Sequence, residues 1–255
     1  MKKSIFPLTL LTIVATTLLS ACSKKQTIQD NNSSSTAISL HQNAPGDSTI
    51  YGLACDGCTD SILVFLPYAG GDPDTFDIIE AEKQHHVFGR THIGDELALL
   101  TNPENHHEAL MVINVNELQG MWCCMVTPTL RHSASGTAVR QLPDSILKRL
   151  MAPREYGLRL KRDYTAYSIG NALNQTTTDD MSPVEYPASK HYTEWCIYNG
   201  RIILRADTIP GVADQPTPEN DTVSVVLLHR DSLVLRFADH EQGYYRKREE
   251  RQQSQ

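Results

Sequence analysis

Eight short strand-like segments between residues 118 and 248 constrain the fold of this chain more than any other feature. Each is rich in apolar, β-branched or aromatic residues and is bounded by turn-forming residues. The segments are 121–127, 156–160, 164–169, 192–198, 201–206, 221–229, 232–237 and 244–248. Asn199-Gly200 separates two of them and is the strongest short hairpin pattern in the chain, because both residues accept positive φ. Eight strands joined in sequence are the number at which an up-and-down barrel closes around side chains or one small ligand.

The two ends of this stretch indicate how such a barrel is closed. A Gly-x-Trp pattern, Gly120-Met121-Trp122, opens the first segment, and Arg246 and Arg248 lie in the last. This pattern resembles the opening of lipocalins, and residues 192–237 resemble the lipocalin-like domains of bacterial lipoproteins. The resemblance implies that Gly120 lets the chain pass closely under the barrel and that Trp122 plugs one end. It also implies that an arginine of the last strand, Arg246 or Arg248, covers the indole.

The resemblance covers residues 118–248, so we expect a lipocalin-like domain over 117–249, followed by a polar tail at 250–255. The loops 170–190 and 207–220 are longer than in true lipocalins.

A second group of shorter strand-like runs precedes this domain, over residues 48–116. Gly, Asp, Asn and Pro separate the runs, and these residues either permit positive φ or fix φ in turns. The runs are 49–54, 61–66, 75–81, 85–89, 96–100 and 109–114. Five or six strands with little room for a helix predict a small OB-like or SH3-like barrel. The predicted fold class is therefore all-β, with a small N-terminal β-barrel followed by an eight-stranded up-and-down lipocalin-like barrel. The one helix expected lies at 144–151, with Asp144 as a cap.

The first 21 residues are excluded from the fold, because they are typical of a secretion signal. Lys2 and Lys3 precede a mostly apolar run, and Leu19-Ser20-Ala21-Cys22 follows it. These four residues resemble the lipobox of bacterial lipoproteins. The resemblance implies removal of residues 1–21, diacylglycerol on the Cys22 thiol and acylation of its new amine. The alternative is an uncleaved membrane anchor, for which the apolar run is only about long enough.

The segment that follows Cys22 predicts a flexible tether over residues 22–47. It is rich in Ser, Asn and Gln, has no aromatic residue and has too little apolar surface to form a core. By resemblance to the sorting rules of lipoproteins, Ser23 rather than Asp after Cys22 favours the outer membrane. We expect the protein to face the periplasm, with the membrane as a partner through its lipid.

The pair Cys55 and Cys58 forms a C-x-x-C between two predicted strands. Three interpretations are open: a structural disulfide, which an oxidising envelope permits, two idle thiols, or a metal site that would need further ligands. The disulfide is the prediction. Cys123, Cys124 and Cys196 remain, and neighbouring residues on a strand face opposite ways. At most one of Cys123 and Cys124 can therefore readily meet Cys196.

Charge and motifs exclude several functions. The whole chain has a net charge of −7, and without the two signal lysines it has 21 basic and 30 acidic residues, or −9. An acidic chain without a basic stripe argues against nucleic acid as a partner. The paired histidines at 85–86 and 106–107 are expected to be solvated, and Asp72, Asp74 and Asp77 lack the spacing of a calcium loop. No nucleotide, hydrolase or metalloprotease motif is present, so we expect no catalysis, no cofactor and no metal.

The sequence therefore predicts a lipid-anchored binding module for a small apolar ligand or an envelope protein. Two alternatives stay open. One is an envelope enzyme, hydrolase-like, with a site assembled from distant residues. The other is a scaffold whose barrels are packed solid.

Overall fold

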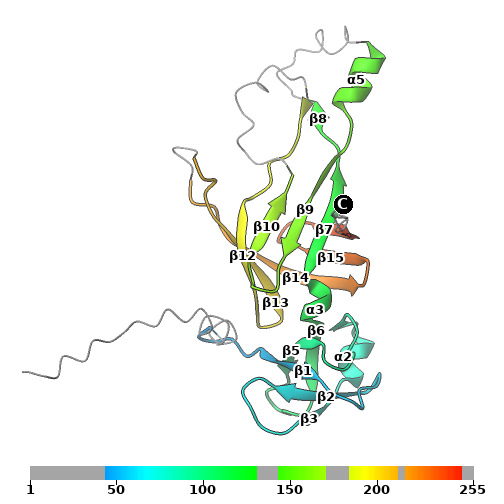
Figure 1. Cartoon of the computed structure of the whole chain (residues 1–255), viewed down its shortest axis with the longest axis vertical. Helices are drawn as coiled ribbons and strands as arrows, with labels where there is room; N and C mark the ends of the chain where they lie inside the picture. Colours follow the sequence, from blue (N-terminus) through cyan, green and yellow to red (C-terminus); the bar gives the residue numbers. More distant parts are fainter. Residues whose placement is uncertain (1–43, 131–142, 171–183, 212–215, 249–255) are drawn as a thin grey trace, which may run out of the picture. The chain divides into compact units, whose positions relative to one another are not determined.

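We analysed a computed structural model of the chain, which describes residues 44–130, 143–170, 184–211 and 216–248. The predicted signal segment, Cys22 and the predicted polar tail lie outside these ranges. Within them strands predominate, which confirms an all-β protein (Figure 1). No helix in the described ranges is long and apolar enough to cross a membrane.

All eight strands predicted for the C-terminal domain are present and form one antiparallel sheet. They are β7 (Gly120–Val126), β9 (Arg154–Leu160), β10 (Ala166–Ile169), β12 (Tyr192–Tyr198), β13 (Arg201–Ala206), β14 (Asp221–His229), β15 (Ser232–Arg236) and β16 (Glu241–Lys247). Their order in the sheet is β10-β9-β7-β16-β15-β14-β13-β12. The last strand therefore pairs with the first, with Arg246 opposite Trp122.

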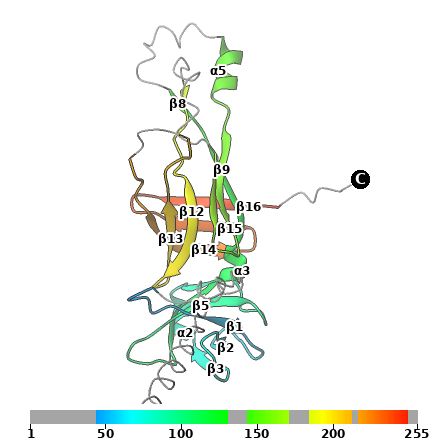
Figure 2. The ribbon, with the colours of Figure 1, turned by 60° about the vertical axis from the view of Figure 1, so that its left-hand side comes forward.

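The two edge strands of this sheet, β10 and β12, meet and nearly close it into a barrel. Thr165 and Glu194 form an antiparallel bridge, and the Trp195 backbone N–H donates to the Tyr164 carbonyl at 2.9 Å. At the start of β12, the Tyr192 N–H donates to the Ser168 Oγ of β10 at 3.0 Å. Figure 1 shows β9, β10 and β12 running alongside one another, and in Figure 2 β9 and β12 run along the same axis. The prediction of an eight-stranded up-and-down barrel is confirmed as a nearly closed barrel of eight antiparallel strands.

The turn between β12 and β13 has the geometry that its sequence predicts. Asn199 and Gly200 have φ of 48° and 73°, and Tyr198 pairs with Arg201. Both central residues of a type I′ turn require positive φ, which Asn and Gly accept at low cost. The Asn199 side chain also bonds with residues 46–48, since its Oδ1 accepts from the Ser48 N–H at 2.8 Å. The end of the segment predicted as a tether is thus attached to this turn.

The N-terminal strands form a second sheet of six strands. They are β1 (Ile50–Ala54), β2 (Ile62–Pro67), β3 (Asp74–Asp77), β4 (Val87–Phe88), β5 (Glu96–Thr101) and β6 (Ala109–Asn114), in the order β3-β2-β1-β5-β6-β4. A parallel bridge joins Asp77, at the end of β3, to Glu108, just before β6. The Asp77 N–H donates to the His107 carbonyl at 2.7 Å at the same point.

Residues 75–81, predicted as one strand, are a strand followed by a helix. After β3 the chain forms α2 (Ile79–Lys83). The Ile79 backbone N–H donates a hydrogen bond to the Asp77 carboxylate at 2.8 Å. Ala81 is buried, whereas Glu80 and Lys83 form an exposed ion pair. The sequence IEAEK is built from good helix formers, and short apolar runs do not by themselves distinguish strand from helix. The expectation of little room for a helix here was wrong.

Two further helices flank the barrel strands. α3 (Val115–Leu118) leads directly into β7, and the Asn114 side chain accepts from the Glu117 N–H at its start. α5 (Asp144–Leu150) occupies the predicted position, but its N-cap is Pro143 and Asp144 makes no capping hydrogen bond. The prediction of Asp144 as the cap was therefore wrong. Asp144 lies in the first turn, where a negative charge interacts favourably with the helix dipole. A two-stranded sheet of β8 (Thr129–Leu130) and β11 (Val184–Glu185) was not predicted.

Buried side chains form two clusters. The smaller lies within the N-terminal sheet around Phe65 and Leu99. The larger lies within the barrel and continues into residues of the N-terminal sheet, including Tyr51 and Ile113. The Tyr51 hydroxyl donates to the Ile197 carbonyl at 3.0 Å. The two predicted domains therefore share buried contacts.

Candidate functional site: a cavity in the barrel

One end of the barrel is closed by Trp122. Its side chain is fully buried, and its indole N–H donates to the Leu118 carbonyl of α3 at 2.7 Å. A buried indole needs such an acceptor, because an unpaired N–H in an apolar interior is costly. The short helix α3 thus positions the indole at the start of β7.

Arg246 lies over the indole from the neighbouring strand β16. Its guanidinium carbon is 4.1 Å from the centroid of the Trp122 ring. Its nitrogens also donate to the carbonyls of Gln119 at 2.7 Å, of Arg230 at 2.5 Å, and of Glu117. Of the two arginines considered from the sequence, Arg246 occupies this place. Arg248 is exposed and pairs with Asp231 at 3.6 Å.

Gly120 makes room for the arginine. It has φ of +139°, and a Cβ atom at this position would lie 2.4 Å from the Arg246 Nη1. A side chain at this position would therefore have to displace the end of Arg246, and the positive φ independently favours glycine. Gly120, Trp122 and Arg246 thus lie together at one end of the barrel.

A cavity of about 380 Å³ lies toward the other end of the barrel. Cys124 and Val126 follow Trp122 along β7, and antiparallel pairing places Tyr156 beside Cys124. The lining residues come from β7, β9, β10, β12, β14, β16 and the segments next to them: Cys124, Val126, Tyr156, Gly157, Leu158, Ser168, Ile169, Pro187, Ala188, Ser189, Lys190, Tyr192, Asp221, Phe237, Ala238, Asp239, His240, Gln242 and Tyr244.

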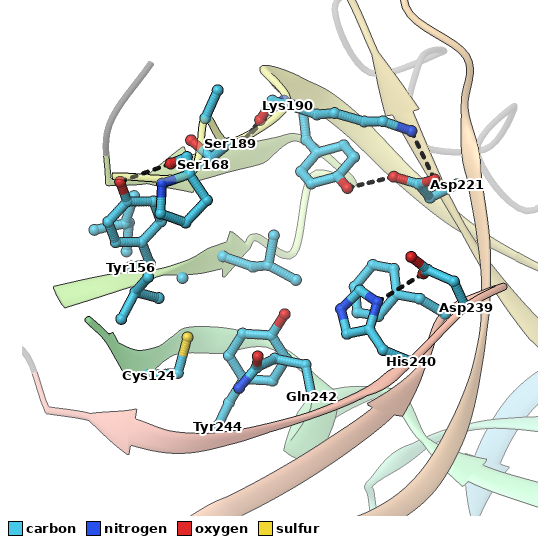
Figure 3. Close-up of a pocket in the computed structure, with 18 of the residues that line it drawn as sticks. Cys124, Tyr156, Ser168, Ser189, Lys190, Asp221, Asp239, His240, Gln242 and Tyr244 are labelled. Atoms are coloured by element: carbon cyan, nitrogen blue, oxygen red, sulfur yellow. Dashed lines mark hydrogen bonds and ion pairs between the residues drawn. The ribbon is translucent and has the colours of Figure 1, made fainter. Parts of the chain in front are cut away.

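A chain of polar contacts runs along one side of the cavity (Figure 3). The Tyr192 hydroxyl donates to Asp221 Oδ2 at 2.5 Å, and Lys190 Nζ lies 2.8 Å from Asp221 Oδ1. Lys190 also donates to the Glu219 carbonyl at 3.2 Å. Burial, together with the hydrogen bond to Asp221, raises the pKa of Tyr192 well above its ordinary value. Tyr192 therefore remains a neutral donor at any physiological pH.

A histidine and an aspartate pair with each other between the end of β15 and the start of β16. His240 Nδ1 is 2.7 Å from Asp239 Oδ1, and the His240 ring stacks on Phe237 with centroids 4.9 Å apart. The hydrogen bond from His240 lowers the pKa of Asp239. The side chain of Asp239 is 84% exposed, so this pair lies at the edge of the cavity.

Cys124 and Tyr244 lie across the cavity from Lys190, and Tyr156 pairs with Cys124 from β9. Figure 3 shows Cys124 and Tyr244 next to each other on neighbouring strands, and the Tyr156 hydroxyl donates to the Pro187 carbonyl at 2.8 Å. Burial raises the pKa of the Cys124 thiol and that of the Tyr244 hydroxyl. A protonated thiol in this position behaves as a small apolar group.

All five described cysteines are free thiols in the structure. The Cys58 Sγ lies 3.2 Å from the Cys55 carbonyl oxygen, so the C-x-x-C forms a tight turn between β1 and β2. The disulfide at this pair stays a prediction. Cys124 faces the cavity, whereas Cys123 and Cys196 alternate with inward-facing neighbours on their strands and so face outward.

The described histidines outside the barrel are not grouped as metal ligands. Within the described ranges, no group of three or more His, Cys, Asp or Glu side chains is placed to hold a metal ion.

Sequence reasoning named the plug residues but not the cavity residues. Lys190, Asp221 and His240 come from separate segments, and no spacing in the sequence links them. The only pattern available was strand alternation, which places Cys124 and Val126 on the same face as Trp122.

Comparisons with known proteins leave the family of this chain open. No family model matches the sequence, and no curated protein matches it. Among solved structures, the chain is similar to a lipocalin-like protein from Bacteroides thetaiotaomicron, with 18% identity and a TM-score of 0.28. The match covers 51% of this chain and 95% of that one. So low a structural similarity supports no argument about function.

Proposed function

We propose that this protein is a non-catalytic binding module that holds one small, mainly apolar ligand in the cavity of its barrel. The observation that carries the proposal is a cavity of about 380 Å³ in a near-closed barrel whose other end is filled by Trp122. Binding sites for small molecules are typically concave, of about 300–1,000 Å³, and mostly apolar with a few polar groups. The lining combines apolar residues such as Val126, Leu158 and Phe237 with polar and charged side chains that could orient the head of a ligand.

The size of the cavity limits the ligand. At about 30 Å³ for one water molecule, 380 Å³ corresponds to about a dozen non-hydrogen atoms. A ten-carbon alcohol has this size, so decanol is a suitable probe.

The proposal is tested with two matched tryptophan substitutions on β7. Val126 lines the cavity, whereas its neighbour Met125 is 57% exposed on the outer face. We expect decanol to bind the mature protein at one site by isothermal titration calorimetry. Val126→Trp should weaken binding at least about tenfold, or about 1.4 kcal/mol, because the indole occupies the cavity. Met125→Trp should bind like the parent. Equal binding by all three proteins would place the alcohol elsewhere and refute the proposal.

We also propose that the module works in the cell envelope, held to the outer membrane by lipid on Cys22 and facing the periplasm. The support is the sequence around Cys22, which has the pattern of a lipoprotein processing site. Cys22→Ser should abolish incorporation of radiolabelled palmitate and release the protein from the membrane fraction. A variant that still incorporates label and sediments with membranes would contradict the anchor.

For the N-terminal domain we propose a small barrel of the OB-like type. The support is the bridge between Asp77 and Glu108, which links the end of β3 to the residue before β6, as closure into a small, partly open barrel would require. The helix α2 follows β3 directly.

A further inference from the structure

The positive charge in the cavity lining is already paired. Lys190 is the only Lys or Arg among the described lining residues, and its ammonium bonds to the carboxylate of Asp221 at 2.8 Å and to a backbone carbonyl. Asp221 uses its second oxygen to accept from Tyr192. A ligand carboxylate could engage Lys190 only by separating it from Asp221. That exchange would leave Asp221 without its cation, and its side chain is only 25% exposed.

The remaining charges also disfavour an anion. Asp239 is ionised at neutral pH, and its hydrogen bond with His240 lowers its pKa further. The lining thus has one lysine against two aspartates, and the net charge of the whole chain is −7. An anionic ligand would approach a negative protein and find no unpaired cation in the described lining.

Among the described lining residues, Tyr244 offers a ligand a neutral polar group. The Tyr244 hydroxyl has no hydrogen bond within the described part of the chain, and Figure 3 shows it directed into the cavity beside Cys124. Burial raises the pKa of Tyr244, so the group remains a phenol that can both donate and accept. A hydroxyl or carbonyl on a ligand satisfies this group without bringing a further charge into the cavity.

We propose that the cavity selects an uncharged amphiphile of about a dozen non-hydrogen atoms, whose hydroxyl or carbonyl head bonds with the Tyr244 hydroxyl, and that it rejects fatty-acid-type anions of the same size. This rests on the proposed ligand-binding function. The apolar body of the ligand lies along Val126, Leu158 and the aromatic rings of the lining, and its head reaches β16.

The test compares decanol with decanoate, which share a ten-carbon chain, on the mature protein at pH 7.5. We expect decanoate to bind at least about tenfold more weakly than decanol, because burying an unpaired carboxylate is costly. Tyr244→Phe should weaken decanol about 2- to 10-fold, the range for one lost hydrogen bond. It should leave decanoate unchanged.

The matched control is Tyr245→Phe. Tyr245 is the next residue on β16, faces outward and donates to Glu155 at 2.8 Å, so its hydroxyl is not in the cavity. It should bind decanol like the parent. Decanoate binding as tightly as decanol would overturn the selectivity, and an unchanged affinity in Tyr244→Phe would overturn the position of the head. If neither compound binds at all, the ligand-binding function itself fails, and this inference fails with it.

Discussion

Replacing Arg246 with Met tests whether the plugged end holds the barrel together. The substitution keeps a long apolar side chain next to the Trp122 ring but removes the guanidinium and its hydrogen bonds to three backbone carbonyls. Both the Glu117 and Gln119 carbonyls lie where α3 ends and β7 begins. The change therefore removes the side chain that ties the last strand to the start of the first.

The expected loss in the free energy of unfolding follows from these contacts. A cation over an indole contributes about 0.5–2 kcal/mol, depending on how dry the site is. A hydrogen bond from a charged group contributes about 1.5–3 kcal/mol. Arg246 is only half-buried, and burial lowers its pKa, so part of the gain is offset by desolvation and the freed carbonyls regain water. Counting about one such bond with the ring contact, we expect a loss of about 2–4 kcal/mol. For a folded region of this size that is a fall in Tm of about 4–16 °C.

The assay is thermal unfolding followed by near-UV circular dichroism and tryptophan fluorescence. Both Trp122 and Trp195 are buried, so loss of the plug should also shift emission to the red. Arg248→Met is the matched control, because Arg248 is 77% exposed in a surface ion pair that contributes little. A Tm for Arg246→Met within about 1 °C of that of the control, with unchanged emission, would refute the closing role of Arg246.

Three further changes test neighbouring features. Gly120→Ala should lower Tm by a similar or larger amount, because its Cβ would lie 2.4 Å from a nitrogen of Arg246 and its φ is +139°; a parent-like melt would contradict this. Ending the chain after Gly243 removes most of β16 and leaves β7 and β15 with exposed edges. We therefore expect the truncated protein to lose cooperative unfolding, measured by far-UV circular dichroism. An unchanged transition would show that β16 does not close the barrel. For Cys55 and Cys58, alkylation of protein isolated from an oxidising compartment should succeed only after reduction, as intact mass would show; full alkylation without reductant excludes the disulfide.

The order and number of the barrel strands could be predicted from the sequence, for a local reason. Strand segments such as 192–198 and 201–206 have alternating apolar residues and a turn of defined type between them, and all of this information lies within a few residues. The same reasoning failed at 79–83. The helix α2 there is too short for its period to be distinguished from that of a strand.

The plug was predictable in part, since Gly120 and Trp122 are adjacent in the sequence and alternate along one strand. The choice of Arg246 over Arg248 was decided by tertiary structure. Both residues face the same way on an ideal strand, but the pairing of Arg246 with Trp122 places only its guanidinium within reach of the α3 carbonyls.

The cavity depended entirely on the tertiary structure. Tyr192, Asp221 and Lys190 come together because β12 and β14 both pair with β13 and so begin at the same end of the barrel. Whether the space between them is empty or filled depends on the summed volumes of side chains from most of the strands, which no local pattern contains. The sequence by itself therefore determined a barrel with one plugged end, and only the packing of distant residues determined that the other end contains a cavity with its lysine already paired.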